Sequence, residues 1–386
     1  LRLAGLRINP RANGPSRSRP LNGLVFQNLE SGEEVRVTGL PEEPKITGLS
    51  FSPDGEKIAF VVNVDDDLTL WYAEVKDGKA KRVTQKGLRL NAVYGRPYAW
   101  RFDSKSFVAR TVPADRGEAP SEPIAPAGPI VQENLGKKTP ARTYQDLLQN
   151  PHDEALYDYY TTSQLVRLDL KGKAKNLGEP AIFRSVSVSP DGEYALVQKV
   201  KRPYSYTLQE DDFPKIVEIW NMDGEVVHVV ADLPLQDMVP ISFGSVPTGP
   251  RSYDWRSDAA AELSWVEALD GGDGGVEVDE RDRIFTLNAP FDGEPEELMT
   301  LGQRYGGVQW GNGDLAFVVS WWWKTRNLKV WRIHPDDRAL EPVIVQDRSF
   351  QDRYADPGDP LTIDGPFGRE VILTADDGNT IFLSGA

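Results

Sequence analysis

The chain offers few side chains that could carry out acid–base or nucleophilic catalysis. Its three histidines are His152, His228 and His334. His228 lies within "GEVVHVV", a predicted strand, and His334 precedes a proline in a predicted turn, so both are interpreted as structural. A serine hydrolase of the α/β type needs a Gly-x-Ser-x-Gly turn to expose its nucleophile, and no such pentapeptide occurs. Although a triad can be assembled from distant residues, the sequence predicts no catalytic residue in this chain.

Metal and cofactor chemistry is equally poorly supported. The chain has no cysteine, and no two histidines stand at the spacing of metal ligands. The carboxylates of "VDDDLT" and "LDGGDGG" could bind calcium weakly, but turn and loop chemistry explains both runs more simply. No phosphate-binding loop or dinucleotide fingerprint is present. We therefore predict neither a metal site nor a cofactor.

Composition bounds the class of protein. Apolar residues make up 39% of the chain and there are 10 Trp, which is enough for a large folded core. The net charge of −15 favours solubility and opposes binding to phosphate backbones, so we predict no nucleic-acid partner. No apolar run reaches about 18 residues, so no membrane span is predicted. The chain begins at Leu1 without a visible signal peptide, and we expect a processed, trimmed or partial form of unassigned compartment.

The elements that would position any site come from a repeated turn. Residues 51–60 read "FSPDGEKIAF", and residues 187–196 read "SVSPDGEYAL". Pro-Asp-Gly forms a tight turn because Pro sets φ, Asp bonds the backbone two residues on, and Gly accepts a positive φ. Short alternating strands flank each turn. Four-strand units are predicted at 49–84, 186–231, 253–300 and 308–345, with degenerate copies near Tyr98 and Leu361 and an opening copy at 5–41.

A four-stranded unit repeated at roughly 40–55 residues is typical of a β-propeller, in which each small sheet buries its faces against its neighbours. The chain is therefore predicted to be all-β, a seven-bladed propeller over residues 1–386 whose last blade is incomplete. An all-β solenoid or a pair of sandwiches is the alternative. A segment at about 113–162 is predicted as a partly helical insertion in blade three, with a break at Pro151, acting as a tether or as a gate.

Two aromatic runs invite a binding interpretation. "SWWWKTR" places residues 321–323 on a predicted strand, with Lys324 or Arg326 as cation–π partners. In "KRPYSYTL", Tyr204 and Tyr206 fall on one face of a predicted strand. Packing explains both runs. For "KRPYSYTL" the alternative is a ledge that binds peptides through flat aromatic surface and the guanidinium of Arg202, and for "SWWWKTR" it is a Trp facing the channel or solvent.

Longer segments carry a resemblance to a known family. They include "LRLAGLRINPRANGPSRSR", "LNAVYGRPYAW", "ARTYQDLLQNPHDEALYDYYTTSQLV", "VPISFGSVPTGPRSYDWR", "VEALDGGD", "WWWKTRNLKVW" and "DRSFQDRYADPGDP". These segments resemble the glutamyl endopeptidase branch of the prolyl oligopeptidase family of serine peptidases, which includes a chloroplast enzyme and bacterial relatives. The resemblance covers essentially all 386 residues. A local departure at "SRPLNGLVF" leaves the course of the first blade open.

The resemblance implies an N-terminal propeller followed by a C-terminal α/β-hydrolase domain, which carries a Ser, Asp and His triad and is absent from residues 1–386. The whole enzyme would cut peptides after acidic residues, chiefly Glu, and the propeller would restrict access to the triad. Its partners would be peptide substrates and the hydrolase domain of the same protein. An acidic side chain needs a cationic partner. The candidate substrate-binding residues are Arg142, Arg202, Arg251 and Arg304, although an ordinary surface or strand-end salt bridge is the simpler explanation for each.

A binding module is the second hypothesis. A propeller that docks a protein or peptide without chemistry would show the same repeats, because a fold does not fix a function. The reading frame after residue 386 discriminates between the two hypotheses. A Gly-x-Ser-x-Gly turn with a later Asp and His would support the peptidase, and a stop codon would support the binding module.

Overall fold

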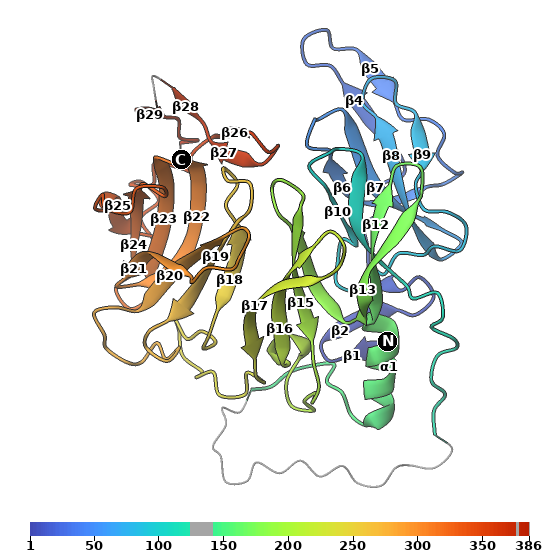
Figure 1. The fold of residues 1–386 in the computed structure, drawn as a ribbon, viewed down its shortest axis with the longest axis horizontal. Coiled ribbons are helices and arrows are strands. Elements are labelled where there is room, and N and C mark those ends of the chain that lie inside the picture. Colours follow the sequence, from blue (N-terminus) through green and yellow to red (C-terminus); the bar gives the residue numbers. More distant parts are fainter. Residues whose placement is uncertain (124–141, 376–377, 386) are drawn as a thin grey trace. The chain divides into compact units, whose positions relative to one another are not determined.

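The computed structural model describes residues 1–123, 142–375 and 378–385. The chain forms two compact units: a first unit of Leu1–Val188 with Gly192–Asp237, and a second unit of Ser189–Asp191 with Met238–Ala386. Each unit is built almost entirely of antiparallel β-sheet (Figure 1). The prediction of an all-β chain is confirmed.

The first unit contains three four-stranded meanders, in which each strand pairs with the strand before it in the chain. Their strands are β6 (Lys45–Phe51), β7 (Lys57–Val64), β8 (Asp67–Glu74) and β9 (Ala80–Arg82); β10 (Tyr98–Trp100), β11 (Ser106–Thr111), β12 (Ser163–Asp169) and β13 (Ala174–Ala181); and β14 (Phe183–Val188), β15 (Tyr194–Val200), β16 (Lys215–Asn221) and β17 (Val226–Leu233). The predicted units at 49–84 and 186–231 are therefore present.

The second unit contains two more meanders of the same order. Their strands are β18 (Arg251–Trp255), β19 (Glu262–Ala268), β20 (Asp282–Asn288) and β21 (Glu296–Leu301); and β22 (Arg304–Asn312), β23 (Leu315–Trp322), β24 (Asn327–Ile333) and β25 (Val343–Ser349). These match the units predicted at 253–300 and 308–345.

The repeated Ser-Pro-Asp-Gly turns join the first and second strands of their sheets, as predicted. Gly55 (φ 69°) and Gly192 (φ 78°) both adopt positive φ, which a residue without Cβ adopts without steric cost. The serine hydroxyl of each turn donates to the aspartate two residues on, at 2.6 Å for Ser189 and Asp191. The turn chemistry read from the sequence is thus the chemistry that closes the hairpins.

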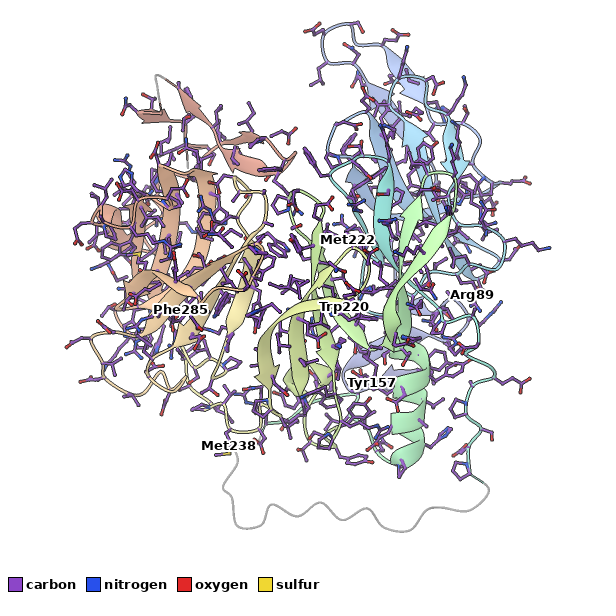
Figure 2. The ribbon with its side chains drawn as sticks, in the orientation of Figure 1. Arg89, Tyr157, Trp220, Met222, Met238 and Phe285 are labelled. Carbon is purple, nitrogen blue, oxygen red and sulfur yellow. The ribbon has the colours of Figure 1, made fainter. Side chains whose placement is uncertain are left out.

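The sheets of the first unit pack face to face. One core cluster joins Leu70 of β8 to Phe107 of β11 and so packs the β6–β9 sheet on the β10–β13 sheet. Another joins Val108 of β11 to Val197 of β15 and Trp220 of β16 (Figure 2). Because Phe107 and Val108 point to opposite faces, the middle sheet buries both faces. This is how a propeller blade is stabilised.

The second unit repeats this arrangement. Ile284 of β20 packs with Trp310 of β22 and Val318 of β23, so the two meanders share a core. On the other face of the β22–β25 sheet, Phe317 packs with Ile372. The sheets therefore have the strand number and packing of blades. The closure of a ring and the count of seven blades stay predictions.

Two predicted copies are not four-stranded sheets within the described residues. Residues 5–41 lie in a three-stranded sheet and a separate hairpin, because the polar, Pro- and Arg-rich stretch between them lacks an alternating apolar pattern. The copy near Leu361 consists of two hairpins. The small strands are β1 (Arg2–Leu3), β2 (Leu6–Asn9), β3 (Gly14–Pro15), β4 (Val25–Gln27), β5 (Glu34–Arg36), β26 (Thr362–Asp364), β27 (Glu370–Ile372), β28 (Thr374–Ala375) and β29 (Thr380–Ile381).

The chain leaves the β10–β13 sheet after β11 and re-enters it at β12, and helix α1 (Pro151–Thr161) lies between them. Pro151 begins this helix instead of breaking a longer one, because the first helical turn needs no backbone donor there. Asn150 caps it by accepting from the backbone N–H of Asp153 at 2.9 Å. Residues 124–141 of the predicted insertion lie outside the described residues.

Helix is scarce in the part of the chain that the structure describes. Apart from α1 there is one 3₁₀ turn, η1 (Glu210–Asp212). Neither has the length and apolar character that a membrane crossing requires.

Candidate functional site

A buried cluster of charged side chains lies in the second unit. Arg304, the first residue of β22, is 1% exposed. Its Nη1 donates to Oδ1 of Asp282 (2.8 Å), and its Nη2 donates to both carboxylate oxygens of Asp270 (2.9 and 2.7 Å). Its Nε donates to the carbonyl oxygen of Gly244 (2.5 Å). Every nitrogen of this guanidinium therefore has an acceptor inside the protein.

Two further arginines share these aspartates. Arg251, the first residue of β18, donates to Asp282 (2.6 Å), and Arg281 donates to Asp270 (2.5 Å). The Arg281 guanidinium lies over the Trp322 ring, 3.9 Å from its centroid. Among the described residues, Nη1 of Arg251 and Nε of Arg281 are buried without a hydrogen-bond partner. Three guanidiniums face two carboxylates, so the cluster carries excess positive charge.

The cluster anchors the loop "ISFGSVPTG", part of a segment that carried the family resemblance. Besides the bond from β22 to the carbonyl of Gly244, the glycines of "LDGGDGG" approach this loop closely. A Cβ on Gly272 would lie 2.1 Å from the carbonyl oxygen of Val246, and one on Gly274 would lie 2.4 Å from that of Phe243. Only glycine permits such contact with backbone. Two motifs distant in the sequence thus meet at one place.

The acidic runs considered for calcium have other partners. Asp270 of "LDGGDGG" is bound by two arginines. In "VDDDLT", Asp66 pairs with Arg11, and Oδ1 of Asp67 lies 2.6 Å from Nε of Arg89. Within the described ranges, no group of three possible metal-ligating side chains occurs. The geometry favours the turn and loop interpretation of both runs.

The aromatic run "SWWWKTR" packs beside the same loop. The ring of Trp323 lies 5.2 Å from that of Phe243, which is 73% exposed. Arg326, a predicted cation–π partner, lies 5.8 Å from the Trp323 ring centroid. Lys324 instead pairs with Glu277 at 2.9 Å. The run therefore serves mainly as support for an exposed apolar loop.

Arg202 has a different setting, in the first unit. Its guanidinium donates to Glu154 and, at 2.6 Å, to Asp158, both on α1. Tyr204 and Tyr206 donate to the same two carboxylates, at 2.7 Å for Tyr206 and Glu154. The predicted strand here is wrong: the segment is irregular, because a proline interrupts it and its side chains bond the helix instead. These residues brace α1.

Arg142 lies at the edge of the described residues and is exposed. Its Nη1 donates to the hydroxyl of Tyr144 at 3.3 Å, and that hydroxyl donates to Asp212 at 3.1 Å. Of the four predicted arginines, Arg251 and Arg304 therefore meet at one aspartate in the second unit, while Arg142 and Arg202 belong to separate contacts in the first.

A buried polar group that the sequence did not predict lies beside α1. The hydroxyls of Tyr94 and Tyr157 lie 2.6 Å apart, and Glu210 of η1 is 6% exposed. One carboxylate oxygen of Glu210 lies 3.3 Å from Nε of Arg184. Burial raises the pKa of Glu210 to about 7. No local motif marks this carboxyl, since its surroundings come from distant segments.

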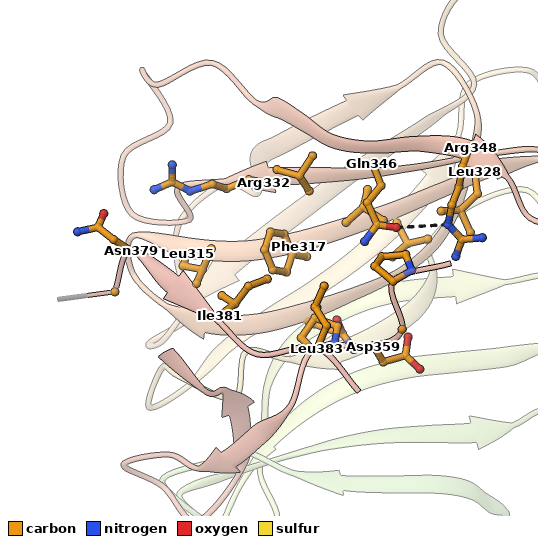
Figure 3. A pocket seen from close by; sticks show the side chains of 18 residues that line it. Leu315, Phe317, Leu328, Arg332, Gln346, Arg348, Asp359, Asn379, Ile381 and Leu383 are labelled. Atoms are coloured by element: carbon orange, nitrogen blue, oxygen red, sulfur yellow. Dashed lines mark hydrogen bonds between the residues drawn. The ribbon is translucent and has the colours of Figure 1, made fainter. Parts of the chain in front are cut away.

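A hollow of about 500 Å³ lies over one face of the β22–β25 sheet (Figure 3). Phe317 lies on its floor, and Ile381 and Leu383 of the last hairpin region border it. Of its charged lining residues, Arg348 pairs with Asp356, which lies outside the lining, at 2.8 Å. The lining is largely apolar and offers no grouping of acid, base and nucleophile.

Two plant proteins are similar to the chain along its whole length. It is 40% identical over 398 residues to a probable chloroplastic glutamyl endopeptidase of Oryza sativa subsp. japonica, covering 99% of the chain and 42% of that protein. It is 38% identical over 402 residues to the protein of the same name in Arabidopsis thaliana, covering 100% and 42%. The chain thus spans about two fifths of the length of these relatives. No family model matches it.

Solved structures give weaker likenesses. An oligogalacturonate lyase in complex with manganese superimposes with a TM-score of 0.46 at 11% identity, over 87% of this chain and 75% of the lyase. An acylaminoacyl peptidase gives 0.41 at 16% identity, over 80% and 40%. Scores below 0.5 carry no assignment of fold or function.

Proposed function

Because the chain is homologous along its whole length to part of the probable glutamyl endopeptidases of two plants, we propose that it is the propeller part of a serine endopeptidase that cuts after acidic residues. The observation that carries the proposal is 40% identity over 99% of the chain. The relatives are more than twice as long as the matched region. This length leaves room for an α/β-hydrolase domain with the Ser, Asp and His triad.

In this proposal the five four-stranded sheets are blades, and the propeller admits peptides to the triad while excluding folded proteins. The face-to-face packing within each unit supports the blade assignment. The excursion between β11 and β12, braced at α1 by Arg202, is a candidate gate. Long excursions from regular repeats are often functional.

The chemistry would be acyl transfer. The serine of the hydrolase domain would attack the backbone carbonyl of an acidic residue, release the amine product and leave an acyl-enzyme that water hydrolyses. Among the four arginines, Arg142 and Arg202 are accessible to a peptide, whereas Arg304 is enclosed and would act by holding its loop. Arg251 is intermediate, with a 13% exposed side chain paired to Asp282.

The test uses the natural full-length protein, a fluorophosphonate probe and two matched peptides that differ only in Glu or Gln before the scissile bond. We expect cleavage after Glu, little cleavage after Gln, and probe attached to a serine outside residues 1–386. Attachment of the probe to a serine within residues 1–386 would refute the proposal that the nucleophile lies in the hydrolase domain. A full-length protein that neither cleaves nor reacts would instead establish the binding-module hypothesis.

A further inference from the structure

A second hollow, of about 260 Å³, lies in the first unit between its N-terminal segment and the β6–β9 sheet. Asn9 and Pro15 border it from the N-terminal segment, and Thr47 and Val61 border it from the sheet. The hollow has the size of a side chain with its adjoining peptide group. It shares no residue with the charged cluster of the second unit.

Two cations line this hollow, and no carboxylate does. Lys45 opens β6, and Arg96 stands just before β10. Both are exposed, and in the described part of the chain neither lies within 4 Å of a carboxylate oxygen. The Arg96 guanidinium lies 5.7 Å from the centroid of the Tyr98 ring. Because this ring is neutral, the contact does not neutralise the positive charge of Arg96.

Comparison of the repeats shows which partner is missing. Arg96, Arg184 and Arg251 occupy the same position relative to the last residue of the first strand of their sheets. Arg184 has a carboxylate partner from η1, and Arg251 has Asp282. The equivalent Arg96 has none among the described residues. A position that is neutralised inside the protein in two sheets is therefore left for an external anion in a third.

The rest of the lining favours one kind of anion. Val61, Leu68 and Ala92 give an apolar wall, and Asn63 and Thr47 add polar groups that can bind an amide. Phosphate or sulfate exposes polar oxygen in every direction and would leave this wall unmatched. A carboxylate at the end of a short aliphatic stem matches both the cations and the wall.

We propose that this hollow binds the acidic side chain of a peptide, with Lys45 and Arg96 as the cations that receive its carboxylate. The choice of a peptide as the carrier rests on the proposed function, whereas the preference for a carboxylate rests on the lining alone. The site would select acidic segments of a peptide.

The test measures equilibrium binding of N-acetylglutamate methylamide to the full-length protein at low ionic strength, with the glutamine analogue and inorganic phosphate as competing probes. Lys45→Gln and Arg96→Gln should each weaken binding of the glutamate probe about tenfold, since each removes a charged hydrogen bond. Arg36→Gln, at an arginine outside the hollow, is the matched control and should leave binding unchanged. Added salt should weaken binding of the glutamate probe.

Equal affinity for the glutamate and glutamine probes would overturn the inference, as would tighter binding of phosphate or an unchanged affinity in the double variant K45Q/R96Q. Hydrolysis of a Glu peptide, measured separately, distinguishes the two proposals. Binding without hydrolysis would refute the peptidase and keep this site. Hydrolysis after Glu with no loss of binding in the double variant would refute the site and keep the peptidase.

Discussion

Replacing Asp270 by asparagine should expose the charge imbalance of the buried cluster. The Asp270 side chain is 0% exposed and accepts from Arg304 twice, from Arg281 and from the backbone N–H of Gly272. In the D270N variant, three guanidiniums would face the single carboxylate of Asp282. The asparagine NH₂ group would also point at donors, because an amide cannot accept on both sides.

The expected cost follows from the loss of one partner of a buried ion pair, which is about 3–5 kcal/mol. For a domain of about 150–250 residues, each 1 kcal/mol lowers Tm by about 2–4 °C, so the shift should be about 6–20 °C. Arg304→Met should cost less than D270N, although it removes a larger side chain. In that variant Arg251 and Arg281 would each keep one carboxylate, so the cluster would become neutral.

Thermal unfolding followed by tryptophan fluorescence suits this test, because Trp322 stacks under Arg281 and reports on the cluster. Glu277→Gln is the matched control, because it removes one negative charge from the same unit. Glu277 pairs with Lys324, and the side chain of Glu277 is 87% exposed. We expect no measurable shift for the control. A D270N shift no larger than the control's would refute the reasoning, and so would a larger loss in Arg304→Met than in D270N.

Three further predictions concern the first unit. Glu210→Gln should change how the free energy of unfolding depends on pH. Burial raises the pKa of Glu210 in the folded protein to about 7, from an ordinary value of 4.5. The protonated carboxyl therefore stabilises the fold fully below about pH 4.5, and this contribution, up to about 3 kcal/mol, is lost as the pH rises through 7. Urea unfolding should therefore show the variant more stable than the wild type at pH 8 and not at pH 4.5; the same difference at both values would contradict this. Gly224→Ala should destabilise the folded protein by about 1–3 kcal/mol, because Gly224 has φ 85° and an added Cβ would lie 2.2 Å from the backbone nitrogen of Gly178. The control is Gly23→Ala, whose Cβ would meet no atom within 4 Å and which should leave Tm unchanged. Asn150→Ala should cost about 1 kcal/mol through loss of the α1 cap, with Gln149→Ala, outside the cap, as the control in the same melting experiment; equal losses would argue against the cap.

The strands and their turns were predictable because their signals are local. Alternation of apolar residues with a period of two indicates a strand, and the three residues Pro-Asp-Gly favour a tight turn by their own backbone preferences. Five sheets were found near the predicted ranges for this reason. Two strand predictions were wrong for local reasons. Residues 5–41 have no alternating apolar pattern between their short strands. The tyrosines of "KRPYSYTL" follow a proline and donate hydrogen bonds to helix α1, which the sequence of this segment does not indicate.

The charged groups were less predictable because their partners are distant in sequence. Arg304 was singled out as a substrate contact from its type and neighbours, yet Asp282 of β20 in the adjacent sheet and Asp270 of a glycine-rich loop enclose it. The run "LDGGDGG" was considered for calcium, and its first aspartate, Asp270, in fact pairs with two arginines. Residue type predicted that these positions carry charge; only the fold decides which charge they meet.

Each four-stranded sheet has a cation near the start of its first strand, and the sheets differ in the carboxylate that this cation meets. The repeated backbone places a cation near the start of the first strand in every four-stranded sheet: Lys45, Arg96, Arg184, Arg251 and Arg304. Carboxylates from different places neutralise three of them: Glu210 of η1 for Arg184, Asp282 of β20 for Arg251, and Asp282 with Asp270 of the "LDGGDGG" loop for Arg304. The four-stranded sheets therefore share their hairpins and differ in the carboxylate that the cation meets. At Lys45 and Arg96 no carboxylate oxygen of the described residues lies within 4 Å, so in the proposed site these two cations are available to an acidic ligand.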